Sequence, residues 1–291
     1  MNRIDALFSR LKSEGRRALM PFVTAGDPDL PTTAALIAEM IARGAHMVEV
    51  GIPYSDPIAD GPVIAASYHR ALGRGIKLDQ IFQMLRSLRA EAAGGPSASA
   101  PFVTMVSYAI VLRQGVDRYL REAVAAGVDG LIVPDLPIEE ADGLCRKTTE
   151  LDLRLIQLIT PTTPRDRAVR IARATTGFIY YVSVAGITGE RTTLPTDLAE
   201  NVAWLRTQTD LPICIGFGIS LPEHIRTLAP VADGLIIGSA LVRRLIGAEA
   251  RPRSEVVADI GQMIAEFSSS LEAVEARNLP SPPGSGCPEG G

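Results

Sequence analysis

The sequence predicts an α/β protein, a single-domain (β/α)8 barrel, and three observations carry this prediction. Eight short apolar runs rich in β-branched residues alternate with amphipathic helical segments along the 291 residues. Most runs lack hydrophobic–polar alternation, as is typical of parallel strands buried on both faces. Eight βα units in about 250 residues is the size of such a barrel. An open doubly wound sheet is the alternative, but no GxGxxG turn of its nucleotide-binding form follows the first run.

The expected elements follow in order along the chain. The first, MNRIDALFSRLKSEGRR, has the pattern of an amphipathic helix and lacks the continuous apolar stretch of a signal peptide. Strands are expected at 18–26, 46–51, 101–107, 129–135, 154–160, 177–183, 212–218 and 233–239. Helical patterns lie between them, for example at 30–44, 116–127 and 223–232, and Gly or Pro marks most junctions. A helix-to-strand unit recurs at 44–53, 127–137 and 231–241, as a barrel of βα modules requires.

The domain is expected to span residues 1–277, followed by a tail at 278–291. A last helix over 254–274 carries Val257, Ile260, Ile264 and Phe267 at helical spacing, which predicts that it covers the barrel. The tail is rich in Pro and Gly, and we expect it to be disordered. The stretch AAGGPSASA at 92–100 is expected to be a loop of small residues before the third strand.

Composition excludes several classes of protein. The net charge of -4 gives no electrostatic reason to expect nucleic-acid binding. The three cysteines are too few for a disulfide framework and fit a reducing compartment. No apolar run approaches the roughly 18 residues that span a bilayer. We therefore expect a soluble, cytoplasmic protein.

The stretch VEVGIPYSDPIADGP places an acidic residue, Glu49, inside the second predicted strand. Because Val48 and Val50 point to the opposite side, Glu49 should face the barrel interior with Met47 and Gly51. Burial of an unpaired carboxyl group should raise its pKa, which suits a proton shuttle near neutral pH. The alternative is a structural glutamate paired with a buried Arg or Tyr.

A second carboxylate, Asp60, follows this strand in a loop at the barrel mouth, where catalytic residues of such barrels lie. Pro53, Pro57 and Pro62 stiffen the loop by fixing φ. The alternative is that Asp60 and Asp56 only form turns, which Asp favours. Glu49 and Asp60 on one barrel mouth together indicate a functional site.

Two glycine-bearing stretches, GFGIS at 216–220 and GSALV at 238–242, follow the last two strands. Backbone N–H groups at such strand-to-helix turns favour an anion, and barrels often bind phosphate there. Since no lysine accompanies them, binding would rely on backbone amides; plain tight turns are the alternative. The stretch 183–195 predicts either a lid or a mobile surface loop, with Gly186 and Gly189 as hinges and Thr188 able to bond a carboxylate.

The sequence lacks the motifs of several other kinds of functional site. The three histidines are scattered without HxH or HExxH spacing, and no CxxC pair or nucleophile elbow occurs. We therefore predict no metal site and no cofactor. Two carboxylates and a phosphate cradle predict acid–base chemistry on a small phosphorylated substrate.

These motifs together resemble the tryptophan synthase alpha chain family. The matching stretches occur in family order and are LMPFVTAGDP (19–28), VEVGIPYSDPIADGPVI (48–64), RALGRGI (70–76), VPDLPIEE (133–140), GFIYYVSVAGITGE (177–190), GFGIS (216–220) and DGLIIGSALV (233–242). The resemblance implies a (β/α)8 barrel that cleaves indole-3-glycerol phosphate to indole and glyceraldehyde 3-phosphate in a retro-aldol reaction, without metal or organic cofactor.

The resemblance also implies residue roles. Glu49 would be the main acid–base residue, Asp60 would accept a hydrogen bond from the indole N–H, and Thr188 would bond Asp60. The phosphate-binding backbone would be formed by Gly189, Gly218, Gly238 and Ser239. Phe22 and Tyr180 would lie around the substrate.

The chain departs from the family pattern in the loop after the third predicted strand, which the family uses to dock its beta subunit, and at a position after the Asp60 loop. Ala109 and Ile110 stand where the family usually has Asn and Pro, and Ala65 replaces the usual Gln after Ile64. The resemblance implies an alpha subunit working with a beta chain in an α2β2 complex. Two alternatives stay open: a stand-alone lyase that releases free indole, and a non-catalytic partner that only activates a beta chain.

Overall fold

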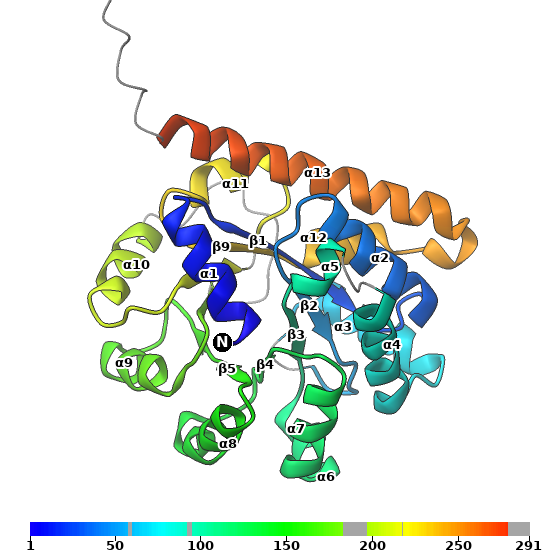
Figure 1. Ribbon diagram of the computed structural model, residues 1–291, viewed down its shortest axis with the longest axis horizontal. Helices are drawn as coiled ribbons and strands as arrows, with labels where there is room; N and C mark the ends of the chain where they lie inside the picture. Colours follow the sequence, from blue (N-terminus) through cyan, green and yellow to red (C-terminus); the bar gives the residue numbers. More distant parts are fainter. Residues whose placement is uncertain (58–59, 92–94, 183–196, 217, 279–291) are drawn as a thin grey trace, which may run out of the picture.

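The computed structural model describes residues 1–57, 60–91, 95–182, 197–216 and 218–278 of the chain, and these form one parallel barrel ringed by helices (Figure 1). The strands are β1 (Ala18–Thr24), β2 (Val48–Gly51), β3 (Phe102–Met105), β4 (Gly130–Ile132), β5 (Arg154–Ile156), β6 (Leu158–Ile159), β7 (Ile179–Val182), β8 (Ile213–Gly216) and β9 (Gly234–Ile237). Nearly every strand residue is buried, which confirms that both faces of the sheet are covered.

Helices alternate with these strands. They are α1 (Arg3–Ser13), α2 (Leu30–Ala42), α3 (Pro62–Gly73), α4 (Leu78–Glu91), α5 (Pro96–Ser99), α6 (Tyr108–Gln114), α7 (Val116–Ala125), α8 (Ile138–Glu150), α9 (Arg165–Ala174), α10 (Leu198–Arg206), α11 (Pro222–Leu228), α12 (Ser239–Arg244) and α13 (Arg253–Asn278), with a 3-10 turn at Ala248–Ala250. Several begin at side-chain caps: Asn2 accepts from the Ile4 N–H at 2.8 Å, and Asp29 accepts from the Thr32 N–H at 2.6 Å.

The strand order β5-β4-β3-β2-β1-β9-β8-β7-β6 closes into a barrel because β5 and β6 are separated by Gln157 alone. The predicted strand at 154–160 is therefore present but broken. The break falls at Gln157, whose side-chain amide donates to the Ala174 carbonyl at 3.0 Å. The ring stays joined across it, since the Tyr180 N–H donates to the Gln157 carbonyl at 3.1 Å. The predicted (β/α)8 barrel is confirmed.

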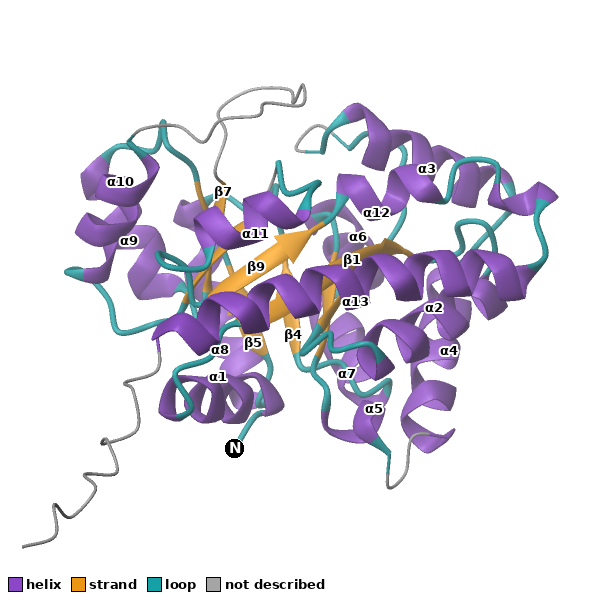
Figure 2. Cartoon of the chain, turned by 90° about the horizontal axis from the view of Figure 1, so that it is seen from above, coloured by secondary structure: helices purple, strands orange, loops and turns teal. Residues whose placement is uncertain are grey.

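The apolar core has two layers. The outer layer lies between strands and helices and contains Val48 and Val50, whereas the barrel interior contains Met47 and Phe22. This sorting confirms the alternation predicted for the second strand. The apolar face of α1 joins the inner layer, with the rings of Phe8 and Phe178 5.7 Å apart. Figure 2 shows α1 on the side of the barrel opposite α3.

Two predicted segments and one predicted core position differ from the structure. The long helix α13 reaches Asn278, which we had assigned to the tail, and residues 279–291 lie outside the described residues. Its Ile260, Ile264 and Phe267 are buried as predicted, but Val256 is buried more fully than Val257. The stretch at 92–100 contains the short helix α5, because Pro96 supplies a helical φ at its first position; residues 92–94 lie outside the description.

Across the described ranges, no helix is both long enough and apolar enough to cross a bilayer.

Candidate active site

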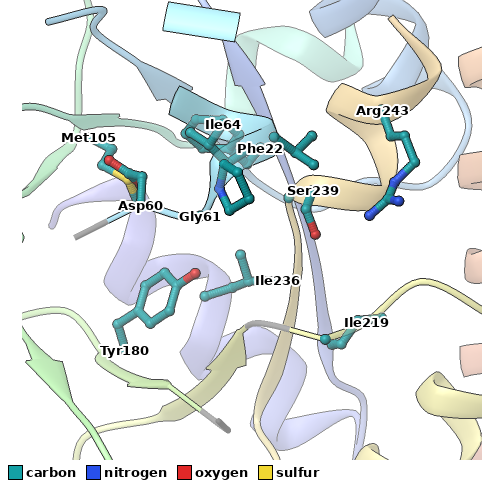
Figure 3. Close-up of a pocket in the computed structure, with 14 residues that line it drawn as sticks. Phe22, Asp60, Gly61, Ile64, Met105, Tyr180, Ile219, Ile236, Ser239 and Arg243 are labelled. Carbon is teal, nitrogen blue, oxygen red and sulfur yellow. The ribbon is translucent and has the colours of Figure 1, made fainter. Parts of the chain in front are cut away.

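A cavity of about 660 Å³, its open mouth included, lies at the carboxyl ends of the strands. It is lined by residues that follow β2, β8 and β9 and by residues within β1, β3, β7 and β9 (Figure 3). The lining residues are Phe22, Asp60, Gly61, Pro62, Val63, Ile64, Met105, Tyr180, Gly218, Ile219, Ile236, Gly238, Ser239 and Arg243. The structure therefore brings Phe22, Asp60, Tyr180, Gly218, Gly238 and Ser239 of the predicted site together.

The two ends of this cavity differ in chemistry. Figure 3 shows Asp60 and Met105 at one end, and Ser239 and Arg243 at the other. Apolar and aromatic side chains, with Phe22 among them, lie between these ends. The cavity is thus suited to a molecule with an aromatic centre, a hydrogen-bond donor at one end and an anion at the other.

Glu49 lies in the interior face of β2 and is fully buried. Its backbone neighbours in the sheet are Phe22 of β1 and Val103 of β3. Among the described residues neither carboxyl oxygen has a hydrogen-bond partner, so no described Arg or Tyr pairs with it as the structural alternative required. Burial raises the pKa of Glu49 well above its usual value, because the charged form loses its hydration. Glu49 does not itself line the cavity.

Asp60 is half-buried at the cavity wall and accepts a hydrogen bond from the Tyr54 hydroxyl at 3.1 Å. Burial raises the pKa of Asp60 to about 6; the nearby charge of Asp135 also raises it, while the Tyr54 hydrogen bond opposes them. Asp135 is held in turn by the Ser107 hydroxyl at 2.6 Å and the Tyr108 N–H at 2.7 Å. Sequence reasoning missed Tyr54, although the residue lies within the quoted motif, because nothing in the pattern shows where its hydroxyl points.

The loop that carries Asp60 is anchored through the helix that follows it. Pro62 is the first residue of α3, directly after Gly61. Farther along α3, Arg70 forms two hydrogen bonds to Asp27, at 3.0 and 2.6 Å, and Ser67 bonds Thr24 at 2.6 Å. These contacts fix α3 to the end of β1. They therefore also hold the end of the Asp60 loop that joins α3.

The predicted anion end is built from two strand-to-helix turns. Gly218 adopts a φ of +80°, which favours glycine, and Gly238 precedes the first residue of α12, Ser239. A side chain at Gly238 would meet only Phe22, at 3.8 Å, so the backbone there faces open space. One turn farther along α12, Arg243 also lines the cavity. The expectation that only backbone amides face this end is therefore incomplete, because the arginine side chain of α12 was not predicted there.

Two predicted site residues, Thr188 and Gly189, lie outside the described residues, as does the predicted lid at 183–195 with its hinge Gly186. The described part of the chain does contain the positions that depart from the family pattern. Ala109 is exposed and Ile110 half-buried at the start of α6, on the same side of the barrel as the cavity.

Fold and cavity together define a (β/α)8-barrel protein with a small-molecule site at the carboxyl ends of its strands. A family model described as tryptophan synthase alpha chain matches residues 8–271. The tryptophan synthase alpha chain of Rhodopirellula baltica is 52% identical over 281 residues, which cover 95% of this chain and 100% of the relative. That of Clostridium kluyveri is 41% identical over 272 residues, covering 94% of this chain and 100% of the relative.

Solved structures give the same result. The tryptophan synthase alpha subunit of Legionella pneumophila has a TM-score of 0.83 and 33% identity, covering 94% of this chain and 99% of that chain. A chain of the tryptophan synthase of M. tuberculosis, in its aminoacrylate-bound form, has a TM-score of 0.79 and 29% identity, covering 93% of this chain and 100% of that chain. The chain belongs to the tryptophan synthase alpha chain family, which makes it a lyase of tryptophan biosynthesis. These relatives give no support to a stand-alone lyase.

Proposed function

We propose that the chain cleaves indole-3-glycerol phosphate to indole and glyceraldehyde 3-phosphate, with Glu49 and Asp60 as its catalytic residues. The observation that carries this proposal is the fully buried carboxyl group of Glu49, which has no hydrogen-bond partner in the described part of the chain, beside a cavity with an acidic end and a cationic end. The reaction needs a proton donor at a carbon atom, a stabiliser of ring charge and an anion site. The chain offers a residue for each.

Glu49 is proposed to move the protons. Its raised pKa favours the protonated carboxyl group at pH values where an ordinary glutamate is ionised, so it is suited to donate a proton to C3 of the indole ring. The resulting carboxylate then takes the proton of the hydroxyl group next to the scissile bond. As that bond breaks, its electron pair returns to the ring, an aldehyde forms, and Glu49 is again protonated. Because Glu49 does not line the cavity, its side chain must gain access to the cavity when substrate binds.

Asp60 is proposed to stabilise the charge that protonation places on the ring. As a carboxylate it accepts a hydrogen bond from the indole N–H, and this bond strengthens as the ring becomes cationic. With a pKa of about 6, Asp60 is mostly ionised at neutral pH. The two carboxyl groups are thus suited to opposite protonation states, as acid–base pairs of this kind require.

The remaining lining residues are proposed to bind the substrate. Phe22 and Tyr180 would pack against the indole ring in the apolar middle of the cavity. The phosphate would lie against the backbone of Gly218 and Gly238 and the hydroxyl group of Ser239, with Gly189 added as the family resemblance implies. Arg243 supplies a positive charge at this end.

We also propose that the chain works as the alpha subunit with a tryptophan synthase beta chain, in the cytoplasm. Membership of the alpha chain family supports this partner, although Ala109 and Ile110 alter the expected docking surface. Cys145 and Cys214 are free thiols, which fits a reducing compartment. The domain, predicted to span residues 1–277, is proposed to end with α13 at Asn278, with the remainder as a tail.

The test is indole release from indole-3-glycerol phosphate by the wild type, Glu49→Gln and Asp60→Asn. Each variant should lose about 10²-fold or more in kcat, the usual contribution of positioned acid–base catalysis. Glu200→Gln, an exposed change on α10, is the matched control and should keep wild-type activity. Near-normal turnover by folded Glu49→Gln would contradict the assignment. Adding a beta subunit tests the partner, since strong activation is expected of an alpha subunit.

A further inference from the structure

We propose that Tyr54 is a positioning residue for this reaction: its hydroxyl group holds the carboxylate of Asp60 in place at the acidic end of the cavity. The inference rests on the proposed function, because it concerns how Asp60 is prepared for its role. It assigns to this chain a support for Asp60 that comes from the same loop. Tyr54 would act only through Asp60 and would not touch the substrate; among the described residues it is not part of the cavity lining.

The contact is well defined in space. The Tyr54 hydroxyl donates to Oδ2 of Asp60 at 3.1 Å, bridging the two sides of the loop between β2 and α3. The Tyr54 ring packs against the ring of Tyr68, with centroids 5.3 Å apart and planes at 47°. A tyrosine ring has few rotatable bonds, so packing on a fixed neighbour leaves its hydroxyl little freedom.

Tyr68 is a firm support for Tyr54. It belongs to α3, is fully buried, and lies so close to Gly51 of β2 that an alanine Cβ there would be 2.9 Å from its hydroxyl oxygen. Tyr68 is thus buried next to β2, its ring packs on the ring of Tyr54, and Tyr54 bonds Asp60. This chain of contacts connects the strand that carries Glu49 to the loop that carries Asp60.

The electrostatics agree with this geometry. Titratable groups facing Asp60 are Tyr54 in its own loop, Tyr68 on α3, Tyr180 on β7 and Asp135 after β4. Burial raises the pKa of all three tyrosines, so they stay neutral and Tyr54 remains a donor. The Tyr54 hydrogen bond lowers the pKa of Asp60, against burial and the charge of Asp135.

Removing the hydroxyl group should therefore leave Asp60 protonated at higher pH. A carboxylate that accepts two or three hydrogen bonds can have its pKa lowered by about two units, so one bond is worth about one. Starting from a pKa of about 6, the midpoint of the acid limb in the pH profile of kcat/KM should then move to higher pH by about one unit. At pH 6 the ionised fraction falls from about one half to about one tenth, while at pH 8 it barely changes.

The experiment compares kcat/KM for indole-3-glycerol phosphate in the wild type and Tyr54→Phe from pH 5.5 to 8.5. The substrate phosphate also titrates near pH 6, but identically for every variant, so the ratio of wild type to variant is the quantity used. We expect this ratio to be about fivefold larger at pH 6 than at pH 8. Tyr119→Phe, which removes the hydroxyl of a buried tyrosine in the outer core layer, should show a ratio near one throughout.

A second measurement is independent of activity. Carbon-13 NMR of proteins labelled at aspartate carboxyl carbons, with Asp60→Asn to assign the signal, gives the pKa of Asp60 directly. We expect this pKa to be higher in Tyr54→Phe than in the wild type, and urea unfolding checks that the variant is folded. An unchanged pKa, or a kcat/KM ratio that is the same at every pH, would overturn the inference. If instead Asp60→Asn retains full activity, the proposed function itself fails, whatever Tyr54→Phe does.

Discussion

The carboxyl group of Glu49 should make the folded protein less stable as pH rises, and Glu49→Gln should remove this effect. Glu49 is fully buried and has no hydrogen-bond partner among the described residues. Burial raises its pKa well above the model-compound value of 4.5, which the unfolded chain should retain. Between these two pKa values the folded state holds a proton that the unfolded state has released. Because the unfolded state binds fewer protons, the free energy of unfolding falls as pH rises through this window.

The magnitude follows from proton linkage. Each pH unit above 4.5, up to the folded-state pKa, lowers the free energy of unfolding by about 1.4 kcal/mol. Glutamine has nearly the shape of a protonated glutamic acid but does not titrate. Wild type and Glu49→Gln should therefore be similarly stable near pH 4.5, and the variant should be about 2.8 kcal/mol more stable once two such units have been crossed. The pH at which the difference stops growing is the folded-state pKa of Glu49.

Equilibrium urea unfolding at half-unit steps between pH 4.5 and 8.5 measures this difference. Glu200→Gln on the exposed surface of α10 is the control, and it should stay within about 0.5 kcal/mol of the wild type at every pH. If Glu49→Gln is instead less stable than the wild type, and increasingly so at higher pH, Glu49 must be an ionised, paired residue. That result would refute both its unpaired state and its proposed role as a proton donor.

Three further changes test the surroundings of the site. Asp135→Asn should move the acid limb of kcat/KM to lower pH, by less than about one pH unit, because it removes a charge that raises the pKa of Asp60; a pH–rate profile measures this, and an upward move would contradict it. Asp129→Asn should lower the free energy of unfolding in urea by about 3 kcal/mol, since it disrupts a buried carboxylate bonded by Arg89 at 2.7 Å; an unchanged midpoint would show that the ion pair adds nothing. Gly51→Ala should destabilise the barrel by about 1–3 kcal/mol in the same assay, because its Cβ would lie 2.5 Å from the Phe22 ring; wild-type stability would mean that the ring moves aside freely.

Much of the fold could be predicted from the sequence because burial patterns are local. Apolar runs without alternation mark strands covered on both faces, and the alternation of Val48, Glu49 and Val50 fixes which side chain points inward. The break of the fifth strand at Gln157 could not be predicted, since no local pattern marks it; in the structure the Gln157 side chain bonds the Ala174 carbonyl there. The helix over 96–99 was missed because its small residues resemble a loop, and only the placement of Pro96 favours a turn of helix.

The site itself was predictable only in part. Residues that follow strand ends converge by topology, which is why Asp60, Gly218 and Gly238 were expected together and lie around one cavity. Contacts made by side chains within a loop, or one turn into a helix, cannot be predicted from topology. The hydroxyl of Tyr54 and the side chain of Arg243 reach the site through their rotamers, and no spacing rule in the sequence gives those directions.

The two carboxyl groups differ in how deeply they are buried and in whether a hydrogen-bond donor faces them. Glu49 is fully buried and Asp60 is half-buried, and burial raises the pKa of each. Glu49 has no donor among the described residues, so no hydrogen bond opposes the effect of burial on its pKa, whereas the Tyr54 hydroxyl lowers the pKa of the less buried Asp60, which ionises above about pH 6. Catalysis that needs a protonated Glu49 and an ionised Asp60 is then confined to the interval between the two pKa values, which gives a bell-shaped profile. Weakening the Tyr54 hydrogen bond should raise the lower pH limit of that interval, which is set by Asp60. The upper limit, set by Glu49, should stay unchanged, because no hydrogen bond joins Tyr54 to Glu49.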